Sequence, residues 1–279
     1  MSALRDDFAR AASRYDAAAV LAQEVGRRMA ERLDYVRIAP QAMADVGCAT
    51  GDGIVNLQRR FPKATPVAVD FARPMLHQVA ARSGFIDRLR GRAPRLVNAD
   101  VRALPLVSGS LDLVWSNLML HWLEDPRPAF NELRRVLAVG GLLSISLLGP
   151  DTLLELRQAC ATLGLPAPRR TFFDMHDVGD MLVGAGFADP VMDTERITLT
   201  YTNPRGILRD QRHLGVRNAL FGMFAAAGWR DWRRLFAAWP RIEQRLPTTF
   251  EVVYGHAWKP EPKATDDGRQ IIAFHPRKS

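Results

Sequence analysis

The sequence has 279 residues, 47% hydrophobic and 24% charged, as in a soluble globular protein with one large core, or one core and a small lid. Cys48 and Cys160 are too few and too far apart for a disulfide framework. Membrane-spanning apolar runs are absent, and charged Arg5, Asp6 and Asp7 occupy the place of a signal peptide's apolar region, so we expect a cytoplasmic protein. The net charge of +8 favours an acidic partner without choosing between nucleic acid, an anionic membrane and a protein.

In chain order, residues 4–33 carry apolar side chains every three or four positions, which predicts helix. Short apolar runs follow, most of them closing on an acid or a small polar residue, at 42–47, 66–70, 95–100, 110–117 and 140–149. Helical patterns of crossover length separate them. This alternation predicts an α/β protein with a doubly wound, mostly parallel sheet and helices on both faces.

The last third has a different pattern. Residues 175–187 predict a helix ended by Gly184 and Gly186, and residues 195–201 and 250–259 predict two strands that form a closing hairpin. Hairpin loops usually have about 2 to 5 residues, so the intervening residues 202–249 predict a helical lid or docking insertion.

We therefore divide the chain into four parts. Residues 1–39 form a helical cap, residues 40–201 with 250–259 form the ligand-binding domain, and residues 202–249 form the insertion. Residues 260–279 form a tail that is Pro-rich and charged at first, and we expect it to be loosely ordered.

The stretch "MADVGCATGDG" at residues 43–53 leads from a strand through small residues into a helix. This arrangement holds nucleotide-like ligands where strand ends meet helix N-termini, and Gly47 and Gly51 would let the backbone approach such a ligand. Asp45 precedes the glycines, which suits a ligand with a cationic or amine group better than a pyrophosphate. No lysine followed by Ser or Thr closes the turn, which excludes a P-loop.

Two further acids end the next predicted strands. Asp70 is placed to accept hydrogen bonds from the hydroxyls of a ribose, and Asp100 to accept one from the exocyclic amine of an adenine. Three successive strands that each end in Asp predict a nucleoside site more specifically than the small residues alone.

The motifs "DVGCATG", "VDFARPML", "NADVRALPL" and "LDLVWSNLMLHW" resemble those of the class I S-adenosylmethionine-dependent methyltransferases. Segments "FARAASRYDAAAVLAQ", "SNLMLHWLEDPRPAFNELRRVL" and "LRDQRHLGVRN" narrow the resemblance to the malonyl-acyl carrier protein O-methyltransferases of biotin synthesis. The resemblance implies a Rossmann-like methyltransferase fold with a seven-stranded sheet, an antiparallel last strand and a helical lid.

The resemblance also implies S-adenosylmethionine as cofactor. Gly47 would lie against its methionyl end, Asp70 would hold the ribose, and Asp100 with Val101 would hold the adenine edge. The whole implied cofactor set comprises Asp45, Gly47, Cys48, Gly51, Asp70, Phe71, Met75, Asp100, Val101, Asn117 and Leu118. Ala49 stands where the family pattern has a glycine, but it is small enough to fit. Cys48 has no histidine nearby in sequence to activate it, so we interpret it as a small packing residue rather than a nucleophile.

Methyl transfer to a carboxylate needs alignment and exclusion of water more than a general base, because a carboxylate is already ionised at neutral pH. Tyr15 is either a group that orients the reactants or a packing aromatic of an amphipathic helix. His121 and Trp122 could line the acceptor pocket, His121 as a catalytic group and Trp122 as a substrate contact, or they could simply face the core.

Asp174, His176, Asp177 and Asp180 could suggest a metal site, but Asp174 as the N-cap of a helix explains the pattern better, and we expect no metal. In the insertion, Arg205, Arg209 and Arg212 recur at helical spacing, and Trp229, Trp232, Phe236 and Trp239 form a stripe typical of a core-facing helix side. The arginines are either simply solvated or, as the resemblance implies for Arg209 and Arg212, bind an acidic carrier protein. A membrane surface is less favoured, and no nucleic-acid module is recognisable.

Three functions remain open. The first, implied by the resemblance, is methylation of the free carboxylate of malonyl-acyl carrier protein or malonyl-CoA in biotin synthesis. The second is methylation of another small acceptor, such as a quinone precursor. The third is a methyltransferase-fold assembly factor or a hydroxylase that acts on a protein arginine.

Overall fold

The computed structural model describes residues 2–84, 92–168, 172–222, 224 and 228–262. Its sheet has seven strands: β1 (Ala42–Val46), β2 (Thr65–Asp70), β3 (Arg95–Asn98), β4 (Leu111–Asn117), β5 (Leu137–Leu148), β6 (Ala188–Tyr201) and β7 (Leu246–Trp258). Their spatial order is β3-β2-β1-β4-β5-β7-β6. Pairs from β3 to β5 are parallel, whereas β7 is antiparallel to both of its neighbours. This confirms the predicted doubly wound sheet with an antiparallel last strand.

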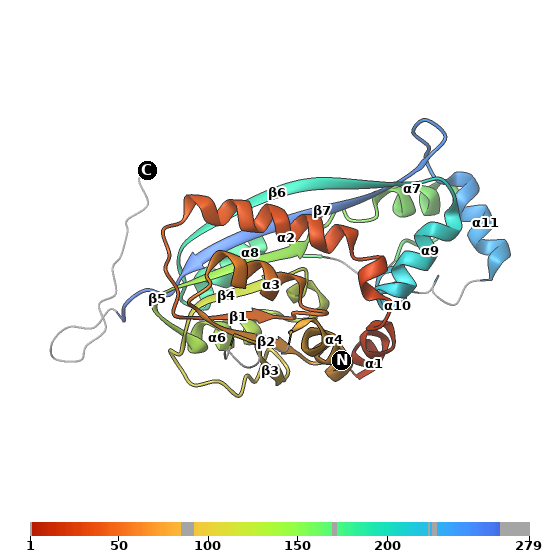
Figure 1. Cartoon of the computed structure of the whole chain (residues 1–279). Coiled ribbons are helices and arrows are strands. Elements are labelled where there is room, and N and C mark those ends of the chain that lie inside the picture. The colour runs from red at the N-terminus through yellow and green to blue at the C-terminus, as the bar shows by residue number, and fades with distance from the viewer. Residues whose placement is uncertain (1, 85–91, 169–171, 223, 225–227, 263–279) are drawn as a thin grey trace, which may run out of the picture.

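Helices cover both faces of the sheet (Figure 1). The α-helices are α1 (Ser2–Ala11), α2 (Val20–Arg32), α3 (Asp52–Arg60), α4 (Arg73–Arg82), α6 (Arg127–Val136), α7 (Leu154–Thr162), α8 (Met175–Gly184), α9 (Pro204–His213), α10 (Arg217–Phe221) and α11 (Trp229–Ala238). Short 3-10 helices are η1 (Tyr15–Ala17), η2 (Leu33–Tyr35) and η3 (Leu120–Trp122). Alternate strand residues face opposite sides, so Met43 packs in the cluster with α2 and α3 while Ala44 packs in the cluster with α6 and α8.

The strand order reverses beside β1, which lies between β2 and β4. The chain crosses from β1 to β2 on one side and later returns to β4 on the other side. In open α/β sheets, ligands bind in the crevice outside the carboxyl ends of the strands at such a reversal. The topology therefore places the ligand site at the ends of β1, β2 and β4.

The segment at residues 4–33, predicted as helical, is interrupted. Helix α1 ends at Ala11, η1 follows, and α2 begins at Val20. The break places Asp16 where its carboxylate accepts hydrogen bonds from Thr50 Oγ1 and from Arg82 Nη2, each at 2.5 Å. Local helix propensity is weak enough to yield to tertiary contacts of this kind.

Four strand boundaries differ from the prediction. Strand β3 ends at Asn98, so Asp100 lies two residues beyond it, and β5, β6 and β7 begin earlier than expected, at Leu137, Ala188 and Leu246. The β6–β7 hairpin keeps its pairing from Ala188 with Trp258 to Tyr201 with Leu246, because ladder partners extend a strand beyond what its own sequence favours. Residues 263–279 of the predicted tail lie outside the described residues.

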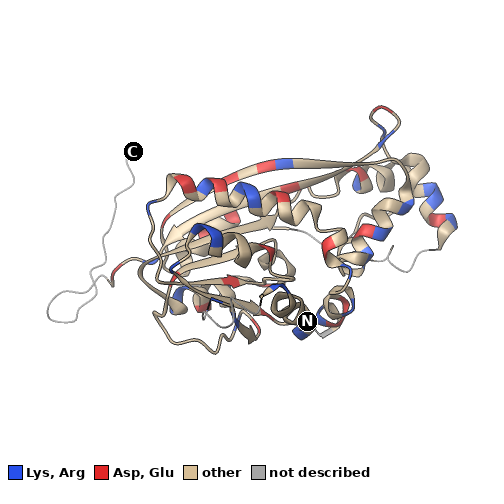
Figure 2. Ribbon diagram, viewed as in Figure 1, with Lys and Arg blue, Asp and Glu red and all other residues tan. Residues whose placement is uncertain are grey.

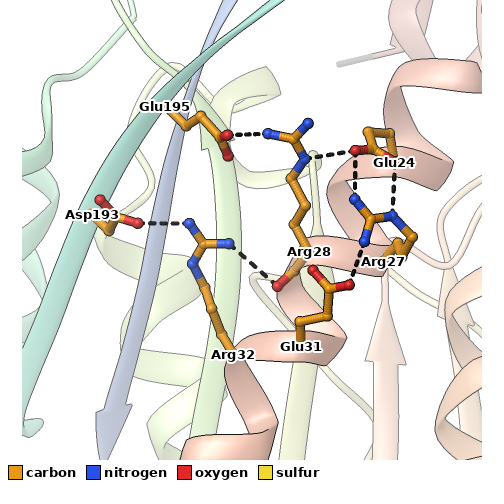
Figure 3. A network of polar contacts seen from close by, with 7 residues as sticks. All are labelled: Glu24, Arg27, Arg28, Glu31, Arg32, Asp193 and Glu195. Carbon is orange, nitrogen blue, oxygen red and sulfur yellow. Dashed lines mark hydrogen bonds and ion pairs between the residues drawn. The ribbon is translucent and has the colours of Figure 1, made fainter.

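An ion-pair network fastens α2 to the edge strand β6 (Figure 3). Arg28 contacts both Glu24 of α2 and Glu195 of β6, and Arg32 Nη2 donates to Asp193 Oδ2 at 2.6 Å. The Arg32 guanidinium also lies 3.7 Å from the centre of the Tyr254 ring. Hydrogen bonds from Arg27 and Arg28 lower the pKa of Glu24 to about 2. The network fixes the helix that follows η1.

The segments before β1 and between β6 and β7 meet beyond the strand ends, where α1 lies beside α10 (Figure 1). Asn218 Nδ2 of α10 donates to Asp7 Oδ2 of α1 at 2.9 Å. Helix α11 packs on α7 and buries Trp232 and Phe236, whereas Trp229 at its start is 46% exposed. Trp239, just after α11, is also buried. The aromatic stripe is therefore core-facing except at Trp229.

Candidate functional site

A cavity that opens to solvent lies at the carboxyl ends of β1, β2 and β4, with about 1040 Å³ of empty space when the open solvent at its mouth is included. Its floor is formed by residues at the strand ends, among them Gly47, Asp70 and Asn117. Its other walls come from α1, η1, η3, α9 and α10. Ligand pockets of α/β proteins typically lie at this switch point of the sheet, are mostly apolar and carry a few polar groups, as this cavity does.

The loop after β1 has a left-handed backbone at three alternate positions. Gly47, Ala49 and Gly51 have φ values of +79°, +44° and +93°. A Cβ atom at Gly47 would lie 2.3 Å from Cγ of Met119, so only glycine fits there. Gly47 and Ala49 line the cavity, whereas Gly51 is the N-cap of α3 and is not among the lining residues. The loop therefore offers backbone rather than side chains to a ligand.

Asp70 is buried at the end of β2, and it lines the cavity. Its Oδ2 accepts a hydrogen bond from the backbone N–H of Ala49 at 3.0 Å, and its Oδ1 accepts one from Ala72 at 2.8 Å. Burial raises the pKa of this carboxyl to about 6, against the opposing effect of the two N–H donors. At neutral pH the group is mainly ionised and can accept further hydrogen bonds.

Asp45 and Cys48 lie in a smaller recess of about 430 Å³, which shares Tyr15, Gly47 and Asn117 with the cavity. Burial, followed by the charge of Asp70, raises the pKa of Asp45 to about 8. Burial also raises the pKa of the Cys48 thiol, which therefore stays protonated and has the character of a packing residue. A cationic group in this recess would stabilise the ionised form of Asp45.

Asp100 and Val101 also line the cavity, beyond the end of β3. Arg102 holds the Asp100 carboxylate at both oxygens, with Nε 2.9 Å from Oδ1 and Nη2 2.6 Å from Oδ2. These hydrogen bonds keep the pKa of Asp100 below its usual value. An adenine amine would have to share this carboxylate with Arg102, a competing partner that the sequence analysis missed.

Phe71 and Met75 come from the start of α4 and the turn before it, and both line the cavity. The Phe71 ring makes an edge contact with Phe8 of α1, at 5.9 Å between ring centres. Phe8 in turn contacts Trp122, at 6.1 Å. These rings form an apolar wall, and Phe8 is a lining residue that the sequence analysis did not single out.

Asn117 connects three elements through its side chain. Its Nδ2 donates to the carbonyl of Ala22 in α2, and its Oδ1 accepts from Ser146 Oγ of β5, both at 2.8 Å. The next residue, Leu118, has a φ of +49°, which is unusual for a residue other than glycine. The N–H of Leu118 donates to Ser146 Oγ at 3.0 Å, so this N–H and the side chain of Asn117 are both engaged within the protein.

Tyr15, His121 and Trp122 all line the cavity. Burial and the nearby charge of Asp70 raise the pKa of Tyr15, so its hydroxyl stays protonated and can donate a hydrogen bond. His121 is 4% exposed, and its Nδ1 accepts a hydrogen bond from the backbone N–H of Leu148 at 3.3 Å. Trp122 packs on His121, with 4.4 Å between ring centres.

Arg209 and Arg212 do not line the cavity. Both are exposed on the outer side of α9, and Arg209 Nε contacts Asp210 Oδ1 at 3.1 Å. Figure 2 shows basic residues recurring along α9 and α11. The inner side of α9 instead contributes Gln211 to the cavity. Its position on the apolar face formed by Ile207, Leu208 and Leu214 is the feature of the sequence that could have identified Gln211.

The Asp174 side chain accepts hydrogen bonds from the backbone N–H groups of His176 and Asp177, each at 2.8 Å. It is the N-cap of α8, in a capping box with Asp177. Across the described ranges, no group of three His, Cys, Asp or Glu side chains is arranged to hold a metal ion. No helix in that part of the chain has the length and apolar character needed to span a membrane.

Comparison with known proteins shows the family to which this chain belongs. Residues 44–145 match the methyltransferase domain family. The malonyl-[acyl-carrier protein] O-methyltransferase of Laribacter hongkongensis is 49% identical over 99% of this chain and 96% of its own length. The protein of the same name from Gallionella capsiferriformans is 47% identical over 97% of this chain and 94% of its own length. This chain belongs to the malonyl-acyl carrier protein O-methyltransferase family.

Solved structures share this fold. A Haemonchus contortus phosphoethanolamine N-methyltransferase in complex with S-adenosyl-L-methionine superposes with a TM-score of 0.53, at 17% identity, over 84% of this chain and 52% of the other. The YcgJ protein from Bacillus subtilis gives 0.56, at 15% identity, over 84% of this chain and 98% of the other. At such identities the likeness extends to the fold alone. Membership of the family, at 47 to 49% identity over nearly the whole chain, identifies the chain as an S-adenosylmethionine-dependent methyltransferase.

Proposed function

We propose that the chain methylates the free carboxylate of malonyl-acyl carrier protein, or of malonyl-CoA, to a methyl ester in the biotin pathway. The observation that carries this proposal is the composition of the cavity. Its floor holds the carboxylates of Asp70 and Asp100, the rest is mostly apolar, and no Lys or Arg is found among the described residues that line it.

The residues present fit S-adenosylmethionine. Gly47 presents bare backbone at the cavity, Asp70 has an ionised carboxylate for a ribose, and Phe71 is a flat apolar neighbour for a base. In this assignment the recess with Asp45 holds the amino end of the cofactor. Bound there, S-adenosylmethionine would supply an electrophilic methyl group on a sulfonium ion.

A cavity without cationic side chains suits a carboxylate nucleophile. The acceptor carboxylate is ionised at neutral pH, so no general base is needed. An arginine in the cavity would form an ion pair with that carboxylate and stabilise the reactant state, which would raise the barrier to methyl transfer. Neutral donors can orient the carboxylate with less stabilisation of the reactant state. Tyr15 is the neutral donor that we assign to orientation, and His121 and Trp122 are assigned to the acceptor wall. Closure of the cavity would exclude water.

In this proposal, residues 1–39 and the insertion at residues 202–249 close the cavity above the strand ends. Arg209 and Arg212, exposed on the outer side of α9, would bind the acidic surface of the carrier protein. With the two buried, free cysteines, the proposal locates the enzyme in the reducing cytoplasm.

The test is incubation of the purified chain with methyl-labelled S-adenosylmethionine and malonyl-carrier protein. We expect label on the acyl group that mild base releases, as an ester requires. Acetyl-carrier protein, which lacks the free carboxylate, is the matched control and should take up no label. Tight cofactor binding without transfer to the malonyl group would overturn the proposal.

A further inference from the structure

Gln211 is a buried polar residue with an unmet hydrogen-bonding capacity. It lies near the end of α9, its residue is 2% exposed, and its side chain lines the cavity. Among the described residues, its Oε1 has no hydrogen-bond partner. Its backbone carbonyl is satisfied, because the N–H of Val216 donates to it at 3.0 Å. A buried amide left unpaired is costly, so such a group in a cavity indicates a partner on the ligand.

Packing does not explain an amide at this position. The same side of α9 carries Ile207 and Leu208, both buried, and Leu214 follows one turn later. Val216 and Leu220 are the next lining residues along the chain. A leucine or methionine would continue this apolar surface without an orphan polar atom. The amide is therefore a cost in stability that binding can offset.

The chemistry of a carboxamide restricts the partner. It presents an acceptor oxygen next to donor N–H groups, and another amide is the neutral group that complements both. A malonyl carboxylate only accepts hydrogen bonds, so it would leave Oε1 unpaired. The flexible arm that carries the acyl group in carrier protein and in coenzyme A contains amides a few bonds from the thioester sulfur.

The position of Gln211 agrees with such a contact. It comes from α9, in the insertion, whereas Asp70 and Gly47 form the floor at the strand ends. The outer side of the same helix carries Arg209 and Arg212. An arm that enters from a carrier protein on that outer side would pass α9 before its acyl end reaches the floor.

We propose that Gln211 hydrogen-bonds an amide of the pantetheine arm and so selects pantetheine thioesters, a role that rests on the methyltransferase function proposed above. Gln211 is thus a specificity-determining residue of the acceptor channel. It has no part in cofactor binding or in the transfer step itself.

The test pairs two substrates with two proteins. Malonyl-N-acetylcysteamine keeps the amide nearest the sulfur, and the S-pentyl malonyl thioester replaces that amide with methylenes. For the wild-type chain we expect kcat/KM to be about tenfold higher with the first substrate, since one hydrogen bond of about 1.4 kcal/mol corresponds to that factor. Gln211→Met should remove this preference by lowering the first value and leaving the second unchanged.

Gln158→Met is the matched control, because Gln158 lies exposed on α7 outside the cavity. It should keep the wild-type preference. Affinity for S-adenosylmethionine, measured by calorimetry, should be equal in all three proteins, and the melting temperature of Gln211→Met should be no lower than that of the wild type. If Gln211→Met does not fold, Gln211→Leu takes its place.

Each outcome has a separate meaning. A preference retained in the Gln211 variant overturns the assignment. An equal loss on both thioesters also overturns it, because it indicates a contact with the malonyl group that they share. A wild-type protein that methylates neither thioester nor malonyl-carrier protein overturns the proposed function, and this inference with it.

Discussion

The backbone N–H of Ala49 donates a hydrogen bond to Oδ2 of Asp70 at 3.0 Å, so the acid at the end of β2 holds the loop that follows β1. The second oxygen holds the turn into α4 through Ala72. Asp70 therefore shapes the floor of the cavity as well as presenting a carboxylate to a ligand.

Asp70→Ala should weaken S-adenosylmethionine binding by about 1 to 3 kcal/mol, because it removes a ligand acceptor and loosens the loop. The protein should also be less stable, since two backbone donors lose their partner. Calorimetric titration and urea unfolding measure the two effects. Asp70→Asn is a closer match to the wild type than Asp70→Ala, because it keeps the size of the side chain and one of the two acceptor oxygens. Normal cofactor affinity in Asp70→Ala would contradict the site assignment.

Tyr15→Phe should lower kcat about tenfold and leave cofactor affinity unchanged, because a single orienting hydrogen bond is lost. The pKa of Tyr15 is raised, so the phenol stays protonated and kcat should show no step from this residue between about pH 6 and 9. Steady-state kinetics across that range is the measurement. Tyr35→Phe, at a position 91% exposed, is the control. Unchanged kcat in Tyr15→Phe would favour the packing interpretation.

Asp45 should make the ligand-free protein less stable as the pH rises. Its pKa is about 8 in the fold and about 4 in an unfolded chain, so the folded state holds the proton more tightly across that interval. Stability is fully present below about pH 4 and is lost as the pH rises towards 8. Asp70, with a pKa of about 6, contributes in the same direction, but only in the lower part of the interval.

Urea unfolding at pH 6.5 and 8 isolates the part due to Asp45. We expect the free energy of unfolding to fall by about 1 to 2 kcal/mol between these values in the wild type. Asp45→Asn, which cannot ionise, should show little change. Saturating S-adenosylmethionine should reduce the fall, because a cationic amino group favours the ionised carboxylate. The same pH slope in Asp45→Asn would assign it to other groups.

Charge reversal at Arg209 and Arg212 together should raise KM for malonyl-carrier protein by about three- to tenfold, and more at low salt, because exposed charges act mainly on association. KM for malonyl-N-acetylcysteamine, which has no carrier protein, should stay the same. Reversal of Arg59 on α3 together with Arg127 on α6 is the control for net charge, because both are exposed and the change in charge is the same. An equal effect from that pair would mean that no particular surface binds the carrier.

The contact between Arg28 and Glu195 should contribute about 0.5 to 1 kcal/mol to stability in a double-mutant cycle with alanine, because both side chains are only partly buried. Salt at 1 M should reduce the coupling. The Arg27–Glu31 pair lies within α2 and is more exposed, so its coupling should be smaller. Equal couplings for the two pairs would argue against a role for the first in fastening α2 to β6.

The sheet and most of the cavity floor could be predicted from the sequence because their signals are local. Each parallel strand is an apolar run, and Asp45 and Asp70 stand at strand ends whose positions follow from the same runs. Once the doubly wound topology is inferred, the ends of β1 and β2 must be neighbours. The family resemblance then indicated which residues of the floor face the ligand.

Only the tertiary structure decided how the rest of the site is arranged. The break before Tyr15, the hold of Arg102 on Asp100 and the placement of Gln211 in the cavity all depend on contacts between segments or on side-chain conformation. The periodicity of apolar residues predicts which side of a helix is apolar, but it does not predict which elements pack against that side. The sequence by itself therefore determined the sheet and the residues of the cavity floor, whereas packing of α1, η1 and α9 over that floor determined the other walls of the cavity.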